Sequence, residues 1–162
     1  MRTTHAPILE TRSIPWPDEA ACARFAQGLA QHDALRNASI ELWGPLGAGK
    51  TTFVRHLLRA LGVQGRIKSP TFAVVEAYEL PGLSISHFDF YRFSDPREWE
   101  DAGFRELLAG PGLKLVEWPE HAEGLLPQAD LRLQIAAADD HREVCAQALS
   151  PRGAALRAAL QG

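Results

Sequence analysis

The segment that most constrains the fold is GPLGAGKT, residues 44–51, which fits the pattern G-x-x-x-x-G-K-[S/T] at every position. The apolar run ASIELW, residues 38–43, precedes it and predicts a short buried strand. The stretch TTFVRHLLRALG follows, with Phe53 and Leu57 at helical spacing and Gly62 where a helix would end. A strand, a glycine-rich turn and a helix in this order predict an α/β fold with the turn at the end of a strand.

The same turn predicts a site for phosphate groups. Gly44, Gly47 and Gly49 permit a tightly curled backbone in which several N–H groups point inward. The positive end of the following helix adds to this field, and Lys50 brings a full charge to the phosphate oxygens. The hydroxyl of Thr51 is a suitable ligand for Mg²⁺. We therefore expect a P-loop that binds a nucleoside triphosphate. The competing interpretation, a fortuitous glycine-rich turn, is disfavoured by the flanking strand and helix.

The nucleotide is expected to be ATP, with ADP as its product. Guanine-specific P-loop proteins read their base with an N-K-x-D motif that follows the P-loop. The only asparagine of this chain is Asn37, which precedes the loop. Adenine is therefore favoured over guanine.

Glu117 is the acid that the sequence favours for the metal. It ends the apolar run LKLVE, residues 113–117, which predicts a strand. Ligand sites in open α/β sheets lie at the carboxyl ends of strands, where a P-loop protein needs an acid near its metal. The alternative is a surface glutamate at a strand end. Trp118 and Pro119, which follow, suit either the core or a wall of the nucleotide site.

Asp89 lies in the stretch HFDFYR, and the pattern alone leaves its role open. In an extended strand Phe88 and Phe90 face one side, while His87, Asp89 and Tyr91 face the other. That polar side suits solvent and an active-site cleft equally. Nucleotide hydrolysis needs a group that orients water toward the γ-phosphate, which an acid here would supply. His87 is expected to be structural.

The stretch KSPTF, residues 68–72, predicts an extended loop because Ser69 precedes a proline. Hydroxyl groups on a loop near a γ-phosphate are one way in which switch regions sense the nucleotide. The simpler interpretation is a loop that leads into a strand.

The rest of the chain predicts further strands and helices. PWPDEAACARFAQGLAQ predicts a helix with Pro17 in its first turn, and a hairpin is expected around Pro-Gly at 81–82. LKLVEW predicts a strand, LRLQIAA and REVCAQAL an antiparallel pair, and SDPREWEDAGF and SPRGAALRAALQG helices. We expect one P-loop domain over residues 1–162, with a mixed, partly antiparallel sheet flanked by helices.

Composition limits the class of partner and the compartment. The chain has 162 residues, a formal net charge of -3 and a pI near 6.1, so it lacks the basic surplus of a protein that grips nucleic acid by itself. Its first residues lack the apolar segment of a signal peptide, and no apolar run approaches a membrane span. Cys22 and Cys145 are its only cysteines and lack metal-ligand spacing. We expect a cytoplasmic protein without a membrane partner.

Several segments together resemble the TsaE family, formerly YjeE, of bacterial P-loop ATPases. The matching segments are PDEAA, GPLGAGKTTFVRHLLRALG, IKSPTF, HFDFYRFSDPREWEDAGF and LVEWPEHAEGLLP, in the family's order and spacing. The resemblance covers nearly the whole chain and does not rest on the P-loop alone. It implies a compact P-loop domain with a mixed sheet.

The resemblance also implies a function. TsaE-like proteins serve the synthesis of threonylcarbamoyladenosine beside the tRNA anticodon. They bind a TsaD–TsaB complex, so contact with tRNA is implied only through partners. They hydrolyse ATP slowly, mostly when bound to that complex, and the implied effect of hydrolysis is to reset the transferase for another turnover.

The resemblance assigns roles to individual residues. Magnesium ligands are implied at Thr51 and Glu117, and the catalytic acid at Asp89. The implied phosphate-binding residues are Leu46, Gly47, Ala48, Gly49, Lys50, Thr51 and Thr52. The implied switch-like loop consists of Ser69, Pro70, Thr71 and Phe72. Cys22 stands where the family commonly has threonine near the nucleotide, and a thiol is a weaker donor than a hydroxyl. Arg142 is loosely similar to a late Gly-Arg segment.

Two other functions compete with this one. The size of the chain and its GAGKTT segment also suit a small kinase that phosphorylates a metabolite. Such kinases use a lid that carries arginines, whereas FRELLAGPG is short and has one arginine. The third candidate is a nucleotide-sensing adaptor for which ATP binding matters and hydrolysis is incidental.

Overall fold

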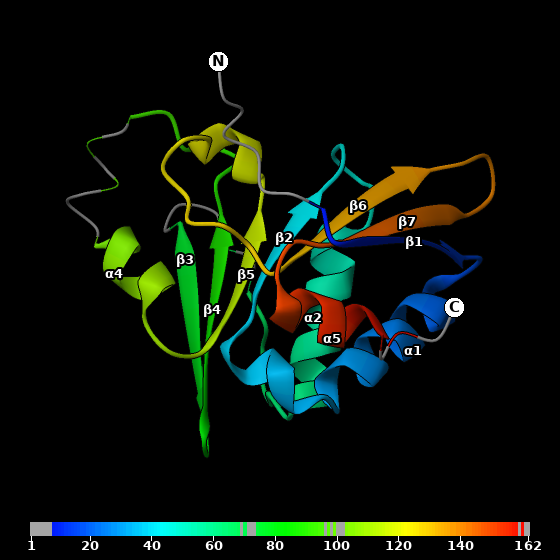
Figure 1. Ribbon diagram of the computed structural model, residues 1–162, viewed down its shortest axis with the longest axis horizontal. Helices are drawn as coiled ribbons and strands as arrows, with labels where there is room; N and C mark the ends of the chain where they lie inside the picture. The colour runs from blue at the N-terminus through cyan, green and yellow to red at the C-terminus, as the bar shows by residue number, and fades with distance from the viewer. Residues whose placement is uncertain are drawn as a thin grey trace.

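The computed structural model describes residues 8–68, 70, 74–95, 97, 99, 103–158 and 160. Within them, seven strands form one sheet in the order β1-β7-β6-β2-β5-β4-β3 (Figure 1). The strands are β1 (Glu10–Trp16), β2 (Ser39–Trp43), β3 (Val75–Leu80), β4 (Leu83–Asp89), β5 (Leu113–Glu117), β6 (Leu131–Ala137) and β7 (Arg142–Ala148). The α-helices are α1 (Glu19–Ala30), α2 (Lys50–Leu61), α4 (Phe104–Ala109) and α5 (Pro151–Ala158), and the short 3-10 helices are η1 (Asp33–Asn37) and η2 (Pro119–Ala122).

The centre of the sheet is parallel and its borders are antiparallel. β2 pairs in parallel with β5 and β6, and β4 joins the other side of β5 in parallel. β3 is antiparallel to β4, while β7 is antiparallel to both β6 and β1. The predicted mixed α/β fold is therefore confirmed, including the hairpin around Pro-Gly and the pair formed by β6 and β7. The carboxyl ends of β4, β5 and β2 meet at one edge of the sheet.

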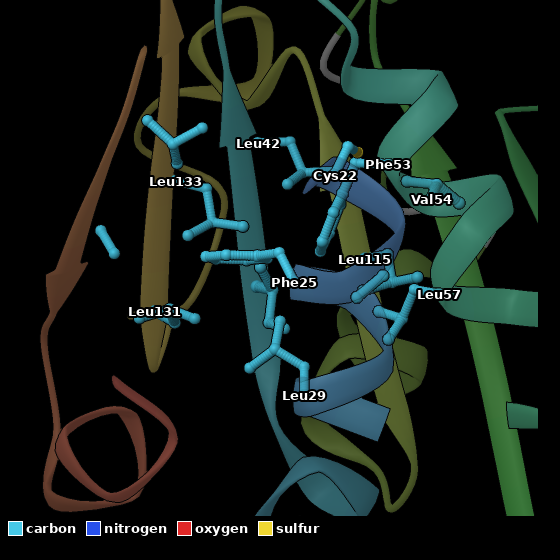
Figure 2. Close-up of a cluster of buried hydrophobic side chains, with 14 of the residues drawn as sticks. Cys22, Phe25, Leu29, Leu42, Phe53, Val54, Leu57, Leu115, Leu131 and Leu133 are labelled. Atoms are coloured by element: carbon cyan, nitrogen blue, oxygen red, sulfur yellow. The ribbon is translucent and has the colours of Figure 1, made fainter. Parts of the chain in front are cut away.

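The main hydrophobic core lies between the sheet and helices α1, α2 and α5. Figure 2 shows Phe25 and Leu29 of α1 and Leu57 of α2 among side chains from the strands. Alternate residues of β2, including Leu42, face this core because successive side chains of a strand point to opposite faces. The N-cap of α1 is Asp18, whose side chain accepts from Ala21 N at 2.9 Å and so satisfies a free helix donor.

A second core lies on the opposite face of β4 and β5. Phe88 and Phe90 stack with ring centroids 5.8 Å apart, and Phe104 meets Phe88 edge-on at 5.9 Å. Val116 of β5 joins them from the neighbouring strand. Phe88 and Phe90 of HFDFYR are thus buried on one face of the sheet, as their alternation predicts. Ile85, His87 and Asp89 alternate with Phe88 along β4 and therefore face the other side of the sheet.

Three local expectations differ from the structure. Residues Glu10–Trp16 form an edge strand that the sequence did not indicate, because pairing with β7 determines it. Pro17 lies before α1, since Asp18 caps a helix that begins at Glu19. β4 ends at Asp89, where Tyr91 N donates to Asp89 Oδ1 at 3.0 Å, so Tyr91 does not continue the alternation. The helix expected from SDPREWEDAGF lies largely outside the described residues.

Gly153 of α5 occupies a position where a side chain has no room. A Cβ there would lie 1.7 Å from the carbonyl oxygen of Asp130. We expect Gly153→Ala to lower the free energy of unfolding by about 2–3 kcal/mol, because backbone must shift to admit the methyl group. Denaturant titration measures the change.

Gly28 of α1 provides the matched control, because a Cβ there meets nothing within 4 Å. Gly28→Ala is expected to leave stability unchanged or to raise it by up to about 1 kcal/mol, since alanine favours a helix. Equal effects of the two substitutions would contradict the steric account of Gly153.

None of the helices in the described part of the chain combines the length and the apolarity that a membrane span requires.

Candidate active site

The P-loop joins β2 to α2 with the backbone conformation that its glycines permit. Gly44, Gly47 and Gly49 have φ angles of 149°, 80° and 111°, in the region that disfavours side chains. Gly44 is further constrained, because a Cβ there would lie 2.6 Å from Ile135 O on β6. Gly49 is the N-cap of α2, so the free N–H groups at that helix end lie beside the loop.

Lys50 opens α2 and is buried, with 4% of its surface exposed. Its Nζ donates to Gly44 O and lies 3.5 Å from the centroid of the Trp118 ring. Burial lowers the pKa of Lys50, and the carboxylates of Glu117 and Glu120 oppose that shift. A cation held in this way is a strong partner for an incoming polyanion.

Thr51 and Glu117 lie side by side. Thr51 Oγ1 donates to Glu117 Oε1 at 3.0 Å, and Glu117 Oε2 is 2.7 Å from His87 Nε2. The side chains of His87 and Glu117 are 1% and 2% exposed, so the carboxylate is held between two fixed contacts. Glu117 lies on the same face of β5 as Leu115 and therefore faces α2. The alternative interpretation, a surface glutamate, is thus excluded. His87, which was expected to be structural, is buried and contacts Glu117 instead of lying on a solvated face.

Asp89 ends β4 directly beside the end of β5, where it is the register partner of Glu117. Its side chain is half-buried and faces the same cavity as the P-loop. Burial raises the pKa of Asp89; the hydrogen bond from Tyr91 N lowers it, and the charge of Glu117 raises it. A partly desolvated carboxylate with a raised pKa suits proton transfer better than an ordinary aspartate.

One cavity of about 280 Å³ joins these groups. Its lining includes residues of the P-loop, the ends of β4 and β5 and the start of β7, namely Leu46, Gly47, Gly49, Lys50, Thr51, Thr52, Asp89, Tyr91, Glu117, Trp118 and Arg142. The tertiary structure therefore brings together Asp89, Glu117 and most of the predicted phosphate-binding residues. Ala48, which belongs to the same loop, is buried and lines a neighbouring cavity instead.

Most of the predicted switch-like loop lies outside the described residues. Ser69, Thr71 and Phe72 lie outside them, and Pro70 is described and buried. The role of this loop stays a prediction.

Two residues of the site carried little or no signal in the sequence. Arg142 donates from Nε to Ala48 O at 2.8 Å and from Nη2 to Gly47 O at 3.1 Å, and so holds the P-loop from β7. Trp118, with the unusual φ of 56°, places its ring over Lys50. Arg142 reaches the loop through strand pairing far along the chain, which local patterns do not encode.

A second cavity, of about 260 Å³, adjoins the first and shares Gly49, Thr52 and Arg142 with it. Its remaining lining comes from the end of β1, the start of α1, the P-loop and the β6–β7 turn, namely Trp16, Pro17, Asp18, Glu19, Cys22, Ala48, Asp140 and His141. Cys22 is 4% exposed, and burial raises the pKa of its thiol to about 12, so this side chain is neutral.

The donor set fits a magnesium–triphosphate group. Mg²⁺ prefers oxygen ligands and takes few from the protein, and a hydroxyl and a carboxylate lie 3.0 Å apart at Thr51 and Glu117. Beside them are a buried ammonium group and the N-terminus of a 12-residue helix, which favour phosphate.

The glycine-rich loop between a parallel strand and a helix, with lysine and threonine at the helix start, defines a P-loop protein of the ATPase type. Residues 16–144 match the family model described as threonylcarbamoyl adenosine biosynthesis protein TsaE. The chain belongs to the TsaE family.

Individual relatives agree with this assignment. The chain is 41% identical over 132 residues to the tRNA threonylcarbamoyladenosine biosynthesis protein TsaE of Haemophilus influenzae, which covers 79% of this chain and 84% of that protein. It is 41% identical over 145 residues to the Bacillus subtilis protein of the same name, covering 89% and 88%. The crystal structure of YdiB from Bacillus subtilis superposes with a TM-score of 0.73 at 29% identity, covering 94% of this chain and 95% of that one.

Proposed function

We propose that the protein is a magnesium-dependent ATPase that acts in the cytoplasm with a TsaD–TsaB-type complex in the threonylcarbamoyladenosine modification of tRNA. The observation that carries the proposal is the contact of Thr51 with Glu117 beside Lys50, with Asp89 next to Glu117 in register. The likeness to the relatives supports the role in tRNA modification, and the chemistry of the site supports ATP hydrolysis as the reaction.

Phosphate binding falls to the P-loop and the start of α2. The backbone N–H groups of Gly47, Gly49 and their neighbours would donate to the phosphate oxygens, and Lys50 would exchange its contact with Gly44 O for them. Thr51 and Glu117 would hold Mg²⁺. When bound, the ion neutralises charge that develops on the phosphate oxygens.

The proposed role of Asp89 is to orient and deprotonate the attacking water. Its carboxylate is fixed by the N–H of Tyr91 and lies at the strand end beside Glu117. Because burial raises its pKa, it is a better proton acceptor than an exposed aspartate. The rate of ATP hydrolysis should therefore be highest above the raised pKa of Asp89 and should fall as the pH drops through that pKa.

The cavity beside Cys22 is the proposed site of the base and ribose. Its lining includes Thr52, which follows the proposed magnesium ligand Thr51 along the chain. Most of its other lining residues lie on the α1 side of the P-loop. Asp18, Glu19 and Asp140 line it, so it disfavours the anionic end of a nucleotide. The base and ribose of ATP, which carry no charge, are therefore the part of the nucleotide that this cavity suits.

Partner dependence is supported by the exposed rim of the phosphate cavity. Leu46 at the tip of the P-loop is 68% exposed, and Tyr91 across the cavity is 41% exposed. A protein that buries these two side chains would cover the site and exclude water from it. The acidic pI of about 6.1 favours contact with tRNA through such a partner rather than directly.

The test is phosphate release from ATP by the protein alone, with a reconstituted TsaD–TsaB complex, and with metabolite pools. We expect slow release that the complex stimulates. Stimulation by metabolite pools alone would favour the small kinase, and binding without turnover under all conditions would favour the nucleotide-sensing adaptor. Either outcome would overturn the proposal.

Glu117→Gln is expected to reduce the gain in ATP affinity that magnesium provides by about tenfold or more, as for other losses at metal sites. The amide keeps the size of the side chain but removes its charge. ATP titrations with Mg²⁺ and with a chelator measure the gain.

Glu41→Gln is the matched control, because Glu41 is also a buried glutamate on a central strand but contacts Trp43 Nε1 at 3.0 Å and Arg132 Nε at 3.3 Å. It should leave the gain from magnesium intact. A Glu117→Gln protein with an undiminished gain would remove Glu117 from the metal site.

A further inference from the structure

His141 is held by carboxylates at both of its ring nitrogens. Nδ1 lies 2.8 Å from Asp140 Oδ1, and Nε2 lies 2.7 Å from Glu143 Oε2. An ionised carboxylate only accepts hydrogen bonds, so both nitrogens must carry protons for both contacts to form. The geometry therefore favours the imidazolium form. In agreement, the hydrogen bonds to Asp140 and then to Glu143 raise the pKa of His141.

This cation lies in the wall of the cavity beside the P-loop. It belongs to the turn between β6 and β7, which is closed by a hydrogen bond from Ala138 N to His141 O at 2.9 Å. The neighbouring residue, Arg142, holds the P-loop carbonyls of Gly47 and Ala48. The position of His141 relative to the phosphate site is therefore fixed through the backbone.

The charges around His141 limit what it can bind. Asp140 and Glu143 contact it directly, Asp18 and Glu19 line the same cavity from the start of α1, and Arg142 follows it on β7. The thiol of Cys22 is neutral. Among the described residues around His141, acids thus outnumber cations, which disfavours a phosphate subsite. With both N–H groups engaged, the ring offers its flat faces and carbon edges to a ligand.

We propose that His141 is a specificity-determining residue on which the purine ring of the nucleotide stacks as on a charged platform. This inference rests on the proposed function, because it assigns the second cavity to the base. A cation against the face of an aromatic ring is attracted by the π-electrons, and the attraction increases when water is excluded. The two carboxylates keep the ring charged and fix its orientation.

The first test compares ATP with inorganic tripolyphosphate, which offers phosphates without a base. We expect His141→Ala to weaken ATP binding by about tenfold, in the range found for removing a side chain on which a base stacks. His141→Phe should retain most of the affinity, because it keeps an aromatic face. Neither substitution should change tripolyphosphate binding by more than about twofold, since the P-loop supplies those contacts.

The comparison separates the two proposals. If neither ligand binds the wild-type protein, the P-loop assignment itself fails. If both bind and His141→Ala leaves ATP affinity unchanged, the stacking role of His141 is wrong while the P-loop assignment stands. Equal weakening of ATP and tripolyphosphate would identify His141 as support for the P-loop rather than a platform for the base.

The second test isolates the charge. The ratio of ATP affinities of wild type and His141→Phe should fall as the pH rises through the raised pKa of His141, because the imidazolium then loses its proton. Asp140→Asn combined with Glu143→Gln should move that fall to lower pH. In NMR spectra, the Cε1–H signal of His141 should shift with ATP but not with tripolyphosphate. A ratio that is constant with pH, or an unmoved signal, would overturn the proposal.

Discussion

Lys50→Ala is expected to weaken ATP binding by roughly 30- to 1000-fold, equivalent to about 2–4 kcal/mol for the loss of a charge-assisted contact in a desolvated site. The ammonium group is buried and points along the P-loop toward Gly44 O, so its full charge is available to phosphate. Isothermal titration with ATP and magnesium measures the loss. An unchanged affinity would contradict the assignment of the P-loop as the nucleotide site.

Lys114→Ala is the matched control for this substitution. Lys114 is 5% exposed, and its Nζ donates to Gly110 O, so it too is a buried lysine on a backbone carbonyl. It lies near the beginning of β5, opposite Ser39 of β2, whereas the P-loop follows the other end of β2. We expect Lys114→Ala to cost stability and to leave ATP affinity unchanged. Comparable losses of affinity would indicate a general effect of removing buried lysines.

Asp89→Asn is expected to slow partner-stimulated ATP hydrolysis by roughly 10²-fold or more, the usual effect of losing a positioned proton acceptor. The amide oxygen can still accept from Tyr91 N, so the turn at the end of β4 is retained and ATP binding should be largely kept. Single-turnover phosphate release with the TsaD–TsaB complex separates hydrolysis from binding. Undiminished turnover would dismiss a catalytic Asp89.

Asp95→Asn is the control for Asp89, because Asp95 Oδ1 accepts from Arg97 N at 3.0 Å in the same two-residue geometry. Asp95 is absent from the lining of the phosphate cavity, so its substitution should leave hydrolysis unchanged. The pH profile adds a second criterion. The acid limb of the wild-type rate should reflect the raised pKa of Asp89 and disappear in the residual rate of Asp89→Asn.

The sequence was most informative where the chain encodes local geometry. The P-loop, the strand before it and the helix after it follow from glycine spacing and apolar periodicity, and all three lie where expected. The apolar run before Glu117 correctly predicted a strand that ends beside the loop. These features need only the conformational freedom of glycine and the burial of alternate side chains.

Local patterns failed where distant strands decide the outcome. Periodicity left Asp89 between solvent and cleft, because a single strand does not show which of its faces another element covers. The position of Asp89 follows from the pairing of β4 with β5. It follows also from the second core around Phe88, which turns the side chains of His87 and Asp89 to the opposite face of the sheet. Arg142 meets the loop only because β7 returns beside β6.

The sequence by itself therefore determined the strand, glycine-rich turn and helix of the P-loop, a mixed α/β fold and the family likeness, since each depends on residues close together along the chain. The tertiary structure decided that Glu117 contacts both Thr51 and His87, that Asp89 faces the same cavity, and that His141 lies in the wall of the adjoining one. These contacts join segments that strand order alone brings together, and hydrogen bonds and desolvation act only at such short distances.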